Sequence, residues 1–320
     1  MPIVNKENST EIVARVLHPV LYIKGAKGQM TVSTEMPEKG LFFKLLNLTA
    51  EDFGDREFKE TYGVSYAIYG GDTASSDAVI SFGKAGCVAA YDPEDRSAQA
   101  LSQEIDNMKA ALGEKPFLVK VDHETDMDLV RLLLDKGVRG VVASAFAAPS
   151  EALVYFRIKG LREEEGRIIV PHKIMAEGSG EDAMKNFVSP PAPEIVTALV
   201  KAGYITAEEA ALAAKIPMAD DLTVEADFSA LPAKADLVDR LQSEFGYQQK
   251  VRVGVAGGID SGTGCLGAFE MGAAYVGSGV SGDDPGKEAI CCLHSCAYHY
   301  MRNLLIRIGA SKNSFQNDIH

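Results

Sequence analysis

The sequence lacks a long apolar run. Its most apolar stretch, Gly140 to Pro149, is far shorter than the roughly 18 residues that a membrane span requires. The first ten residues include Lys6 and Glu7, whereas a secretory signal peptide would carry an unbroken apolar segment there. We therefore expect neither a transmembrane helix nor export, and we predict a cytoplasmic location.

Positive charge is also scarce. The chain carries 32 Lys and Arg residues against 45 Asp and Glu residues, which gives a formal net charge of −13. No run of basic side chains forms a patch that could neutralise several phosphates of a nucleic acid. Nucleic acid is therefore not an expected partner, and neither is a membrane, whereas a homo-oligomer stays open.

Cysteine is limited to five residues, an odd number in a chain without secretory context, and this favours reduced thiols over a disulfide framework. Three candidate metal ligands, Cys292, Cys296 and His299, would share one face of a helix. However, the sequence has no Cys-x-x-Cys pair, and cysteine is among the residue types that are most often buried. We therefore predict a packed helix face and no metal site.

What the sequence does contain is an alternation of short β-branched runs with helical patterns, from about residue 63 onward. The expected strands are Val64–Tyr69, Gly86–Tyr91, Phe117–Val121, Val138–Ser144, Ile168–Ala176, Leu222–Ala226, Val251–Ala256 and Tyr275–Ser278. The helices expected between strands include Ala98–Leu112, Met127–Lys136 and Ala233–Phe245. Most of the strands are apolar at nearly every position, which is typical of parallel strands buried on both faces. Eight such units predict an α/β fold, a (β/α)8 TIM barrel, with a doubly wound sheet as the alternative.

Two segments flank this repeat. Residues 1–62 predict an N-terminal extension that packs on the barrel, with short strands and a helix from Asp52 to Tyr62. The barrel is assigned to residues 63–282, and a C-terminal helix and tail to residues 283–320. The three short strands expected in the extension are Ile12–Val16, Val20–Ile23 and Met30–Ser33.

A third segment, residues 178–219, interrupts the repeat after the fifth strand. It contains a proline-rich breaker, Ser189–Pro193, and two expected helices, the second of which begins at a capping box formed by Thr206 and Glu209. Barrel chemistry takes place at the carboxyl ends of the strands, and long ordered insertions there are usually lids. We therefore predict a helical lid over the barrel mouth.

The last two strands both end in glycines, at Val251–Ile259 and Ala273–Val280. In barrels the loops after strands seven and eight commonly bind a phosphate through backbone N–H groups. The residues predicted to do so are Gly257, Gly258, Gly277, Ser278 and Gly279. The alternative is that these glycines only relieve crowding. The nearby Gly262–Gly267 matches G-x-G-x-x-G, but no further βαβ units follow to complete a dinucleotide fold.

Titratable side chains lie where the barrel strands are expected to end, and a barrel gathers such residues around one mouth. They are Lys120, Asp122, His123, His172, Glu177, Glu225 and Asp227. We favour Lys120 and Glu177 as site residues, followed by His172 or His123. The alternative for each is that strand ends are simply where chains become polar.

Several motifs in this order and spacing are similar to those of one known family. They are Glu57–Gly63 (EFKETYG), Phe82–Gly86 (FGKAG), Ala143–Phe146 (ASAF), Arg157–Leu161 (RIKGL), Phe187–Pro190 (FVSP), Ile216–Asp227 (IPMADDLTVEAD) and Ala256–Ile259 (AGGI). The sequence resembles the PfaD-type proteins, trans-acting enoyl reductases of polyunsaturated fatty acid and polyketide synthases that are related to the 2-nitropropane dioxygenase (nitronate monooxygenase) flavoproteins. The resemblance covers roughly residues 57–282.

The resemblance implies an FMN-dependent oxidoreductase with NADPH as reductant. Its implied partner is an acyl carrier protein or a synthase-bound acyl thioester, on which an enoyl group is reduced. The implied FMN contacts are Gly70, Gly71 and Lys120, together with the two phosphate loops. The candidate catalytic residues, His172, Glu177 and Lys120, come instead from the titratable side chains at the expected strand ends.

The sequence also departs from the family near the expected flavin. Asp227 is followed by Phe228–Leu231, where the family has Ser-Gly-Gly-His, so the histidine expected to donate a proton is missing. Lys120 replaces an Asn, Val142 replaces a Glu and Glu177 replaces a Lys. The loop after the first strand is about four residues shorter than in the family.

These departures leave the chemistry open. Lys120 could place positive charge beside a reduced flavin. The proton donor would be His172, His123, a protonated Glu177 or water, and we prefer His172 because it is expected on the fifth strand. The alternatives to a flavin enzyme are a catalytically silent barrel that acts as a scaffold in a synthase complex, and a flavin-independent barrel enzyme that acts on a phosphorylated metabolite.

Overall fold

The structure, a computed structural model, describes four short strands within residues 2–33 by their backbone. It also describes residues 49–307, except residues 95, 179, 226–228, 258, 280 and 281 and the side chains of 301, 302 and 304–307. Within this part of the chain, no helix combines the length and the apolar composition needed to cross a bilayer.

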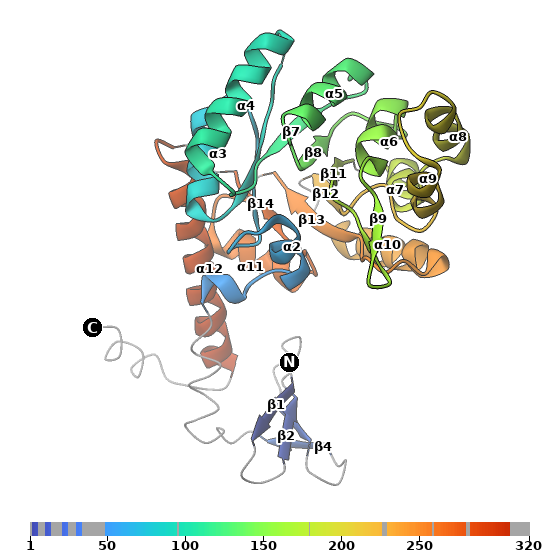
Figure 1. Cartoon of the computed structure of the whole chain (residues 1–320). Helices are drawn as coiled ribbons and strands as arrows, with labels where there is room; N and C mark the ends of the chain where they lie inside the picture. Colours follow the sequence, from blue (N-terminus) through green and yellow to red (C-terminus); the bar gives the residue numbers. More distant parts are fainter. Residues whose placement is uncertain are drawn as a thin grey trace.

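Eight parallel strands close into a barrel, with helices packed around it (Figure 1). In chain order they are β5 (Ile68–Thr73), β6 (Val88–Tyr91), β7 (Leu118–Val121), β8 (Gly140–Ala143), β11 (Lys173–Glu177), β12 (Asp221–Glu225), β13 (Arg252–Ala256) and β14 (Val276–Gly277). The ring closes where β14 pairs with β5. The (β/α)8 prediction is confirmed, and the open doubly wound sheet is excluded because the sheet has no free edge.

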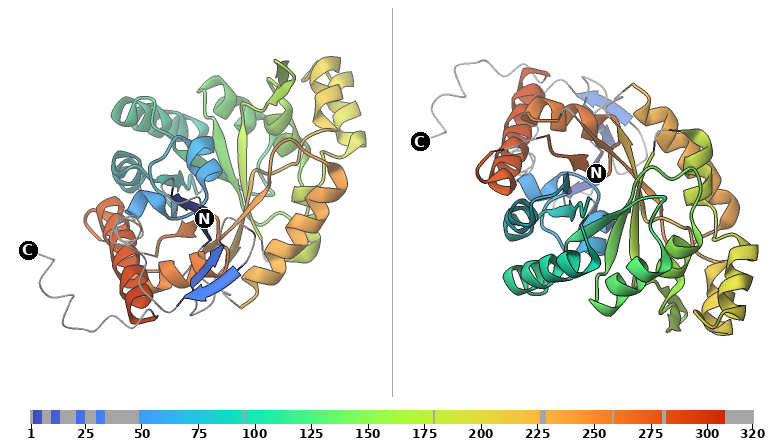
Figure 2. Two further views of the ribbon diagram at one scale, coloured as in Figure 1. Left: turned by 90° about the horizontal axis from the view of Figure 1, so that it is seen from below. Right: turned by 90° about the horizontal axis from the view of Figure 1, so that it is seen from above.

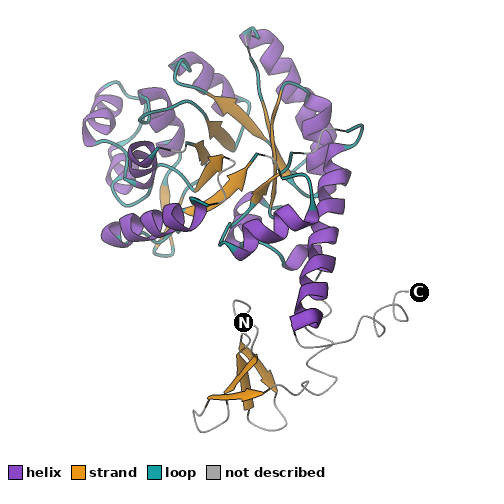
Figure 3. Cartoon of the chain, turned by 180° about the vertical axis from the view of Figure 1, so that it is seen from behind, coloured by secondary structure: helices purple, strands orange, loops and turns teal. Residues whose placement is uncertain are grey.

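Helices surround the strands (Figure 3), and several begin at side-chain caps. They are α3 (Ser76–Ala85), α4 (Ala98–Leu112), α5 (Met127–Asp135), α6 (Glu151–Ile158), α7 (Glu181–Val188), α10 (Leu231–Phe245), α11 (Gly262–Glu270) and α12 (Pro285–Arg307). The side chains of Ser75, Ser97, Asp126 and Ser150 each accept a hydrogen bond from the backbone N–H three residues further on. The three helix ranges predicted from the sequence agree with α4, α5 and α10 to within two residues.

Large side chains fill the inside of the barrel. Tyr69, Met175 and Tyr275 are all buried there. Tyr275 lies directly on the backbone of Gly254, because a Cβ atom at that glycine would come within 2.4 Å of the tyrosine ring. The barrel is therefore a packed core, and chemistry is confined to its ends.

The amino-terminal end of the barrel is closed by a short helix, α2 (Arg56–Tyr62), which follows the 3-10 turn η1 (Ala50–Asp52). The ring of Phe58 stacks on Tyr275 with centroids 4.4 Å apart, and the Tyr62 hydroxyl donates to Asp221 at 2.8 Å. The predicted helix from Asp52 to Tyr62 therefore exists from residue 56 onward.

The N-terminal residues contain an antiparallel sheet of four strands, in the order β1-β2-β3-β4. The strands are β1 (Pro2–Asn5), β2 (Thr10–Val13), β3 (Leu21–Lys24) and β4 (Met30–Ser33). The last three correspond to the three predicted strands, β1 was not predicted, and residues 14–16 and 20 lie outside the described residues. The packing of this extension on the barrel stays a prediction.

The predicted fifth strand, Ile168–Ala176, is divided in two. Its first part is β10 (Arg167–Ile169), which forms an antiparallel hairpin with β9 (Arg162–Glu164), and only the second part, β11, enters the barrel. Pro171 lies between them and has no N–H group to continue a ladder.

The insertion at residues 178–219 contains three helices where two were predicted. They are α7, α8 (Pro193–Lys201) and α9 (Ala207–Ala213). The capping box of α9 is present: Thr206 N–H donates to Glu209 Oε2 at 2.7 Å, and Glu209 N–H donates to Thr206 Oγ1 at 3.1 Å.

The predicted lid is wrong for α8 and α9, because these helices pack against α6 and β9 on the outside of the barrel. Both views of Figure 2 show them at the rim, in yellow. Glu209 Oε1 accepts the Gly160 N–H at 2.6 Å, and Lys159 donates to the carbonyl of Tyr204 at 3.0 Å. These bonds hold the α8–α9 part of the insertion to the outer wall and not over the mouth.

Candidate active site

A lysine joins two strand ends at the mouth of the barrel. The Lys120 ammonium lies 2.5 Å from Asp72 Oδ2 and 2.8 Å from Asp92 Oδ2, and all three side chains are about one quarter exposed. Lys120 is on β7, Asp72 on β5, and Asp92 directly follows β6. The three groups thus bridge neighbouring strands of the ring.

Asp72 owes its position to a bulge in β5. The register between β5 and β6 shifts between Tyr69 and Asp72, and Gly71 within the bulge has φ +75°. A Cβ atom at Gly70 would lie 2.6 Å from the ring of Phe82. The packing of α3 therefore explains the glycine at position 70, and the bulge explains the glycine at position 71, without any contact to FMN.

Glu177 ends β11 on the same side of the barrel and is half-buried. The Tyr69 hydroxyl lies 3.4 Å from its Oε1 atom. Burial raises the pKa of Glu177 to about 7, the nearby Asp72 adds to this shift, and Lys120 and the tyrosine partly offset it. At neutral pH this carboxyl group is therefore protonated in a large fraction of molecules, as a general acid requires.

The charges on the lysine and its partners are mutually stabilised. Burial opposes the charge of Lys120, but its hydrogen bonds to the two aspartates outweigh this effect and raise its pKa. Burial likewise opposes the charge of Asp92, but the bond from Lys120 prevails and lowers the pKa of that carboxyl group. Around neutral pH the mouth therefore holds a fixed ion-pair cluster beside one titrating acid.

The predicted phosphate loops are largely bonded within the chain. The Ser278 N–H donates to the Tyr69 carbonyl at 2.7 Å, and the Gly279 N–H donates to the Ile259 carbonyl at 2.8 Å. A Cβ atom at Gly277 would lie 2.4 Å from Ala256 Cβ, so this glycine does relieve crowding between strands. In the same loops, Gly257 has φ +93° and Gly258 lies outside the described residues.

His172 is not at the mouth, and its prediction as the catalytic acid is wrong. It precedes β11, at the opposite end of that strand from Glu177. Its Nδ1 atom lies 2.7 Å from the Lys159 carbonyl, and its ring packs on Phe156 of α6, 4.9 Å between centroids. Its side chain therefore lies between the barrel and the helices, where burial lowers its pKa.

The remaining predicted residues lie around the mouth. Asp122 and His123 are exposed in the loop after β7, and Glu225 is exposed at the end of β12 and contributes to the raised pKa of Glu177. Asp227 and Phe228 lie outside the described residues.

Sequence reasoning missed Tyr69, Asp72 and Asp92. Asp92 could have been found, because it directly follows the second expected strand, which is the signal that located Lys120. Asp72 could not have been found from the sequence, because its place at the mouth depends on the bulge in β5.

FMN, which the resemblance implies, does not fit the described residues well. The N–H groups of Ser278 and Gly279, which were predicted to hold its phosphate, are used within the chain, and Lys120, a cation at the mouth, is shared by two carboxylates. Further carboxylates, Glu177 and Glu225, line the same end and would repel a phosphate when ionised. We therefore derive no step through this cofactor.

Together, the fold and the mouth define a (β/α)8 barrel with a titratable cluster at the carboxyl ends of its strands, which is where barrel enzymes carry out their chemistry. No family model matches the chain.

The chain is nevertheless similar to proteins of polyunsaturated fatty acid and polyketide synthesis. It is 34% identical over 254 residues to a component of the polyunsaturated fatty acid synthase of a Thraustochytrium species, a match that covers 72% of this chain and 17% of that protein. It is 31% identical over 253 residues to the polyketide biosynthesis protein PksE of Bacillus subtilis, with 72% and 33% covered. The chain thus spans a third or less of the length of these relatives.

One solved structure is similar in both fold and sequence. The enoyl reductase domain of MlnA, from the macrolactin biosynthesis cluster of Bacillus amyloliquefaciens, aligns with a TM-score of 0.69 and 29% identity. The alignment covers 71% of this chain and 56% of that one. These similarities support the resemblance drawn from the sequence motifs.

Proposed function

We propose that this chain is an oxidoreductase barrel that reduces enoyl thioesters in polyketide or polyunsaturated fatty acid synthesis. The similarity to the MlnA enoyl reductase domain, over 71% of the chain, carries this proposal. The proposed substrate is an enoyl group on an acyl carrier protein or a synthase, and the proposed location is the cytoplasm. FMN and NADPH, as the source of the hydride, rest on the resemblance alone.

The proposed contribution of the chain itself is a proton. Reduction of an enoyl thioester adds a hydride at the β-carbon and leaves an enolate, which must gain a proton at the α-carbon. A positioned acid typically contributes about 10² to 10⁴-fold to such a step. Glu177, with a pKa of about 7 at the end of β11, supplies that proton in place of the missing family histidine. Tyr69 orients the carboxyl group.

The test is a comparison of flavin content and activity. The purified protein is examined for visible flavin absorption and then for NADPH-dependent reduction of a crotonyl thioester. Reduction by the wild type, with a large loss in Glu177→Gln at equal cofactor content, supports the proposal. Glu124→Gln, which changes an exposed carboxylate in the loop after β7, is the matched control and should keep full activity. Equal turnover by all three proteins removes Glu177 from the mechanism.

A second candidate, the catalytically silent scaffold, is favoured by a specific observation. The N–H groups of Ser278 and Gly279 and the Lys120 ammonium are already bonded within the chain. A protein that holds no flavin and leaves the crotonyl thioester unchanged would support the scaffold and overturn the reductase. A flavin-free protein that binds a phosphorylated metabolite at the mouth would instead support the third hypothesis, a flavin-independent enzyme.

A further inference from the structure

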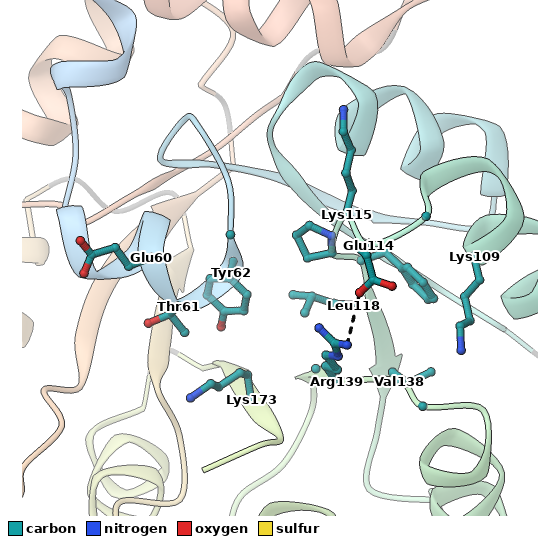
Figure 4. A pocket seen from close by; sticks show the side chains of 16 residues that line it. Glu60, Thr61, Tyr62, Lys109, Glu114, Lys115, Leu118, Val138, Arg139 and Lys173 are labelled. Atoms are coloured by element: carbon teal, nitrogen blue, oxygen red, sulfur yellow. Dashed lines mark hydrogen bonds and ion pairs between the residues drawn. The ribbon is translucent and has the colours of Figure 1, made fainter. Parts of the chain in front are cut away.

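The barrel has a cavity at the end opposite to the mouth. It measures about 370 Å³ and lies between the carboxyl end of α2, the loops that precede β7 and β8, and the first residue of β11 (Figure 4). The cavity lies at one end of β7 and the mouth at the other, and the length of this strand puts them roughly 10 Å apart, at about 3.3 Å per residue. This cavity is therefore distinct from the candidate active site.

We propose that this cavity binds a small phosphate monoester with an apolar body. Its volume lies within the usual range for small-molecule sites. Tyr62, Phe117, Leu118 and Val138 supply apolar surface, and charged side chains from several separate segments surround it. The charged lining residues are Glu60, Lys109, Glu114, Lys115, Arg139 and Lys173.

The positive charges of the lining are poorly compensated. Lys109 donates to the Lys136 carbonyl at 2.6 Å, and Lys115 donates to the Lys84 carbonyl at 3.0 Å, but neither is within ion-pair distance of a carboxylate among the described residues. Carbonyl oxygens satisfy a donor without cancelling its charge. Both lysines therefore leave a net positive potential at the rim.

Arg139 and Lys173, both labelled in Figure 4, are only loosely paired. Arg139 Nη2 lies 3.4 Å from Glu114 Oε2, and these side chains are 78% and 93% exposed, so this surface pair contributes little. Lys173 Nζ lies 3.6 Å from Asp220 Oδ1, but Asp220 is already bound by Arg157 at 2.5 Å. Both cations are thus available to an anion.

The balance of charge favours a dianion. Four cations and two carboxylates line the cavity, so its side chains carry two more positive than negative charges. A phosphate monoester carries about −1.5 to −2 charges at neutral pH, which matches this excess. Arginine and lysine both bind phosphate oxygens well, and the apolar wall can hold an attached hydrocarbon group.

Phenyl phosphate is a suitable probe, because it combines a dianion with an apolar ring. Calorimetric titration of the full chain should show binding, with at least tenfold weaker affinity in the double variant Arg139→Gln/Lys173→Met. Lys201→Gln changes an exposed lysine at the end of α8, away from the cavity, and should bind as the wild type does. Inorganic phosphate alone should bind more weakly than phenyl phosphate.

Arg139→Gln alone protects the test against misfolding, because its side chain is largely exposed, and it should weaken binding about threefold or more. Absence of binding by the wild type at millimolar phenyl phosphate overturns the proposal. So does binding that is unchanged in the folded Arg139 variant, because the anion then lies elsewhere. Equal affinity for inorganic phosphate and phenyl phosphate overturns the apolar part of the site.

Discussion

The two ends of the barrel use the same kinds of charged residues in opposite ways. At the amino-terminal end, Arg252 holds Asp221 through two bonds of 2.7 Å, and both side chains are almost completely buried. At the mouth, Lys120 is shared between two aspartates and all three remain partly exposed. The first arrangement fixes a structure, whereas the second leaves charge accessible to a ligand.

The pKa values show the same contrast. Burial alone would raise the pKa of Asp220 at the amino-terminal end, but Arg157 and Lys173 outweigh it and lower that pKa to about 2. Glu177 at the mouth has no such direct cationic partner among the residues that the structure describes, and burial raises its pKa to about 7. A buried carboxyl group that is bonded to a guanidinium therefore stays ionised and stabilises the fold. A buried carboxyl group without a bonded cation titrates near neutral pH and is suited to proton transfer.

The largest expected effect is the loss of a buried partner at the amino-terminal end. Arg252→Met leaves the Asp221 carboxylate buried without its cation, so we expect the free energy of unfolding to fall by about 3–5 kcal/mol in urea denaturation. Arg139→Gln, an exposed cation near the same end, should cost less than about 1 kcal/mol. A loss of similar size in both variants would contradict the contrast between buried and exposed pairs.

The next effect concerns the acid at the mouth. Glu177→Gln cannot donate a proton and should reduce enoyl turnover about 100-fold, with little change in stability. In the wild type the donor must be protonated, so the rate should fall about tenfold per unit as pH rises above about 7. A wild-type rate that is constant from about pH 6 to about pH 9, which is roughly one unit below to two units above this pKa, would disprove the role of Glu177 when it is measured at constant cofactor content.

A smaller effect is expected from the shared lysine. Lys120 lowers the pKa of Glu177, so Lys120→Gln should move the alkaline limb of the pH–rate profile upward by about one unit. Lys201→Gln, an exposed lysine at the end of α8, provides the control and should leave the profile unchanged. A decrease in flavin content of Lys120→Gln would show that the lysine also contacts the cofactor, as the resemblance implies.

The smallest effect is expected from a substitution on the outer wall of the barrel, away from both of its ends. Thr206→Ala removes one half of the α9 capping box and should cost about 1 kcal/mol in unfolding free energy. Because α8 and α9 pack against α6 and β9, enoyl turnover should not change. A selective loss of affinity for acyl substrates in this variant would instead support the prediction that the insertion forms a lid.

The sequence predicted the barrel because buried parallel strands are apolar at nearly every position, and this pattern does not depend on distant contacts. Lys120 and Glu177 were found because both lie at or next to the carboxyl end of a strand. His172 was misplaced because Pro171 delays the fifth strand, so the histidine precedes the strand instead of lying on it. The internal bonds of Ser278 and Gly279 could not be predicted, because they depend on how the last strand pairs with the first.

That pairing is short, since β14 contributes only Val276 and Gly277 to the ring. The long helix α12 packs on both neighbouring helices, α3 and α11, and its backbone passes so close to them that a Cβ atom at Gly262 or Gly286 would clash. Until β14 has been synthesised, the barrel strands form an open sheet with β5 and β13 as its free edges. We therefore expect ring closure to occur late in folding, with α12 stabilising the closed ring through its contacts with α3 and α11.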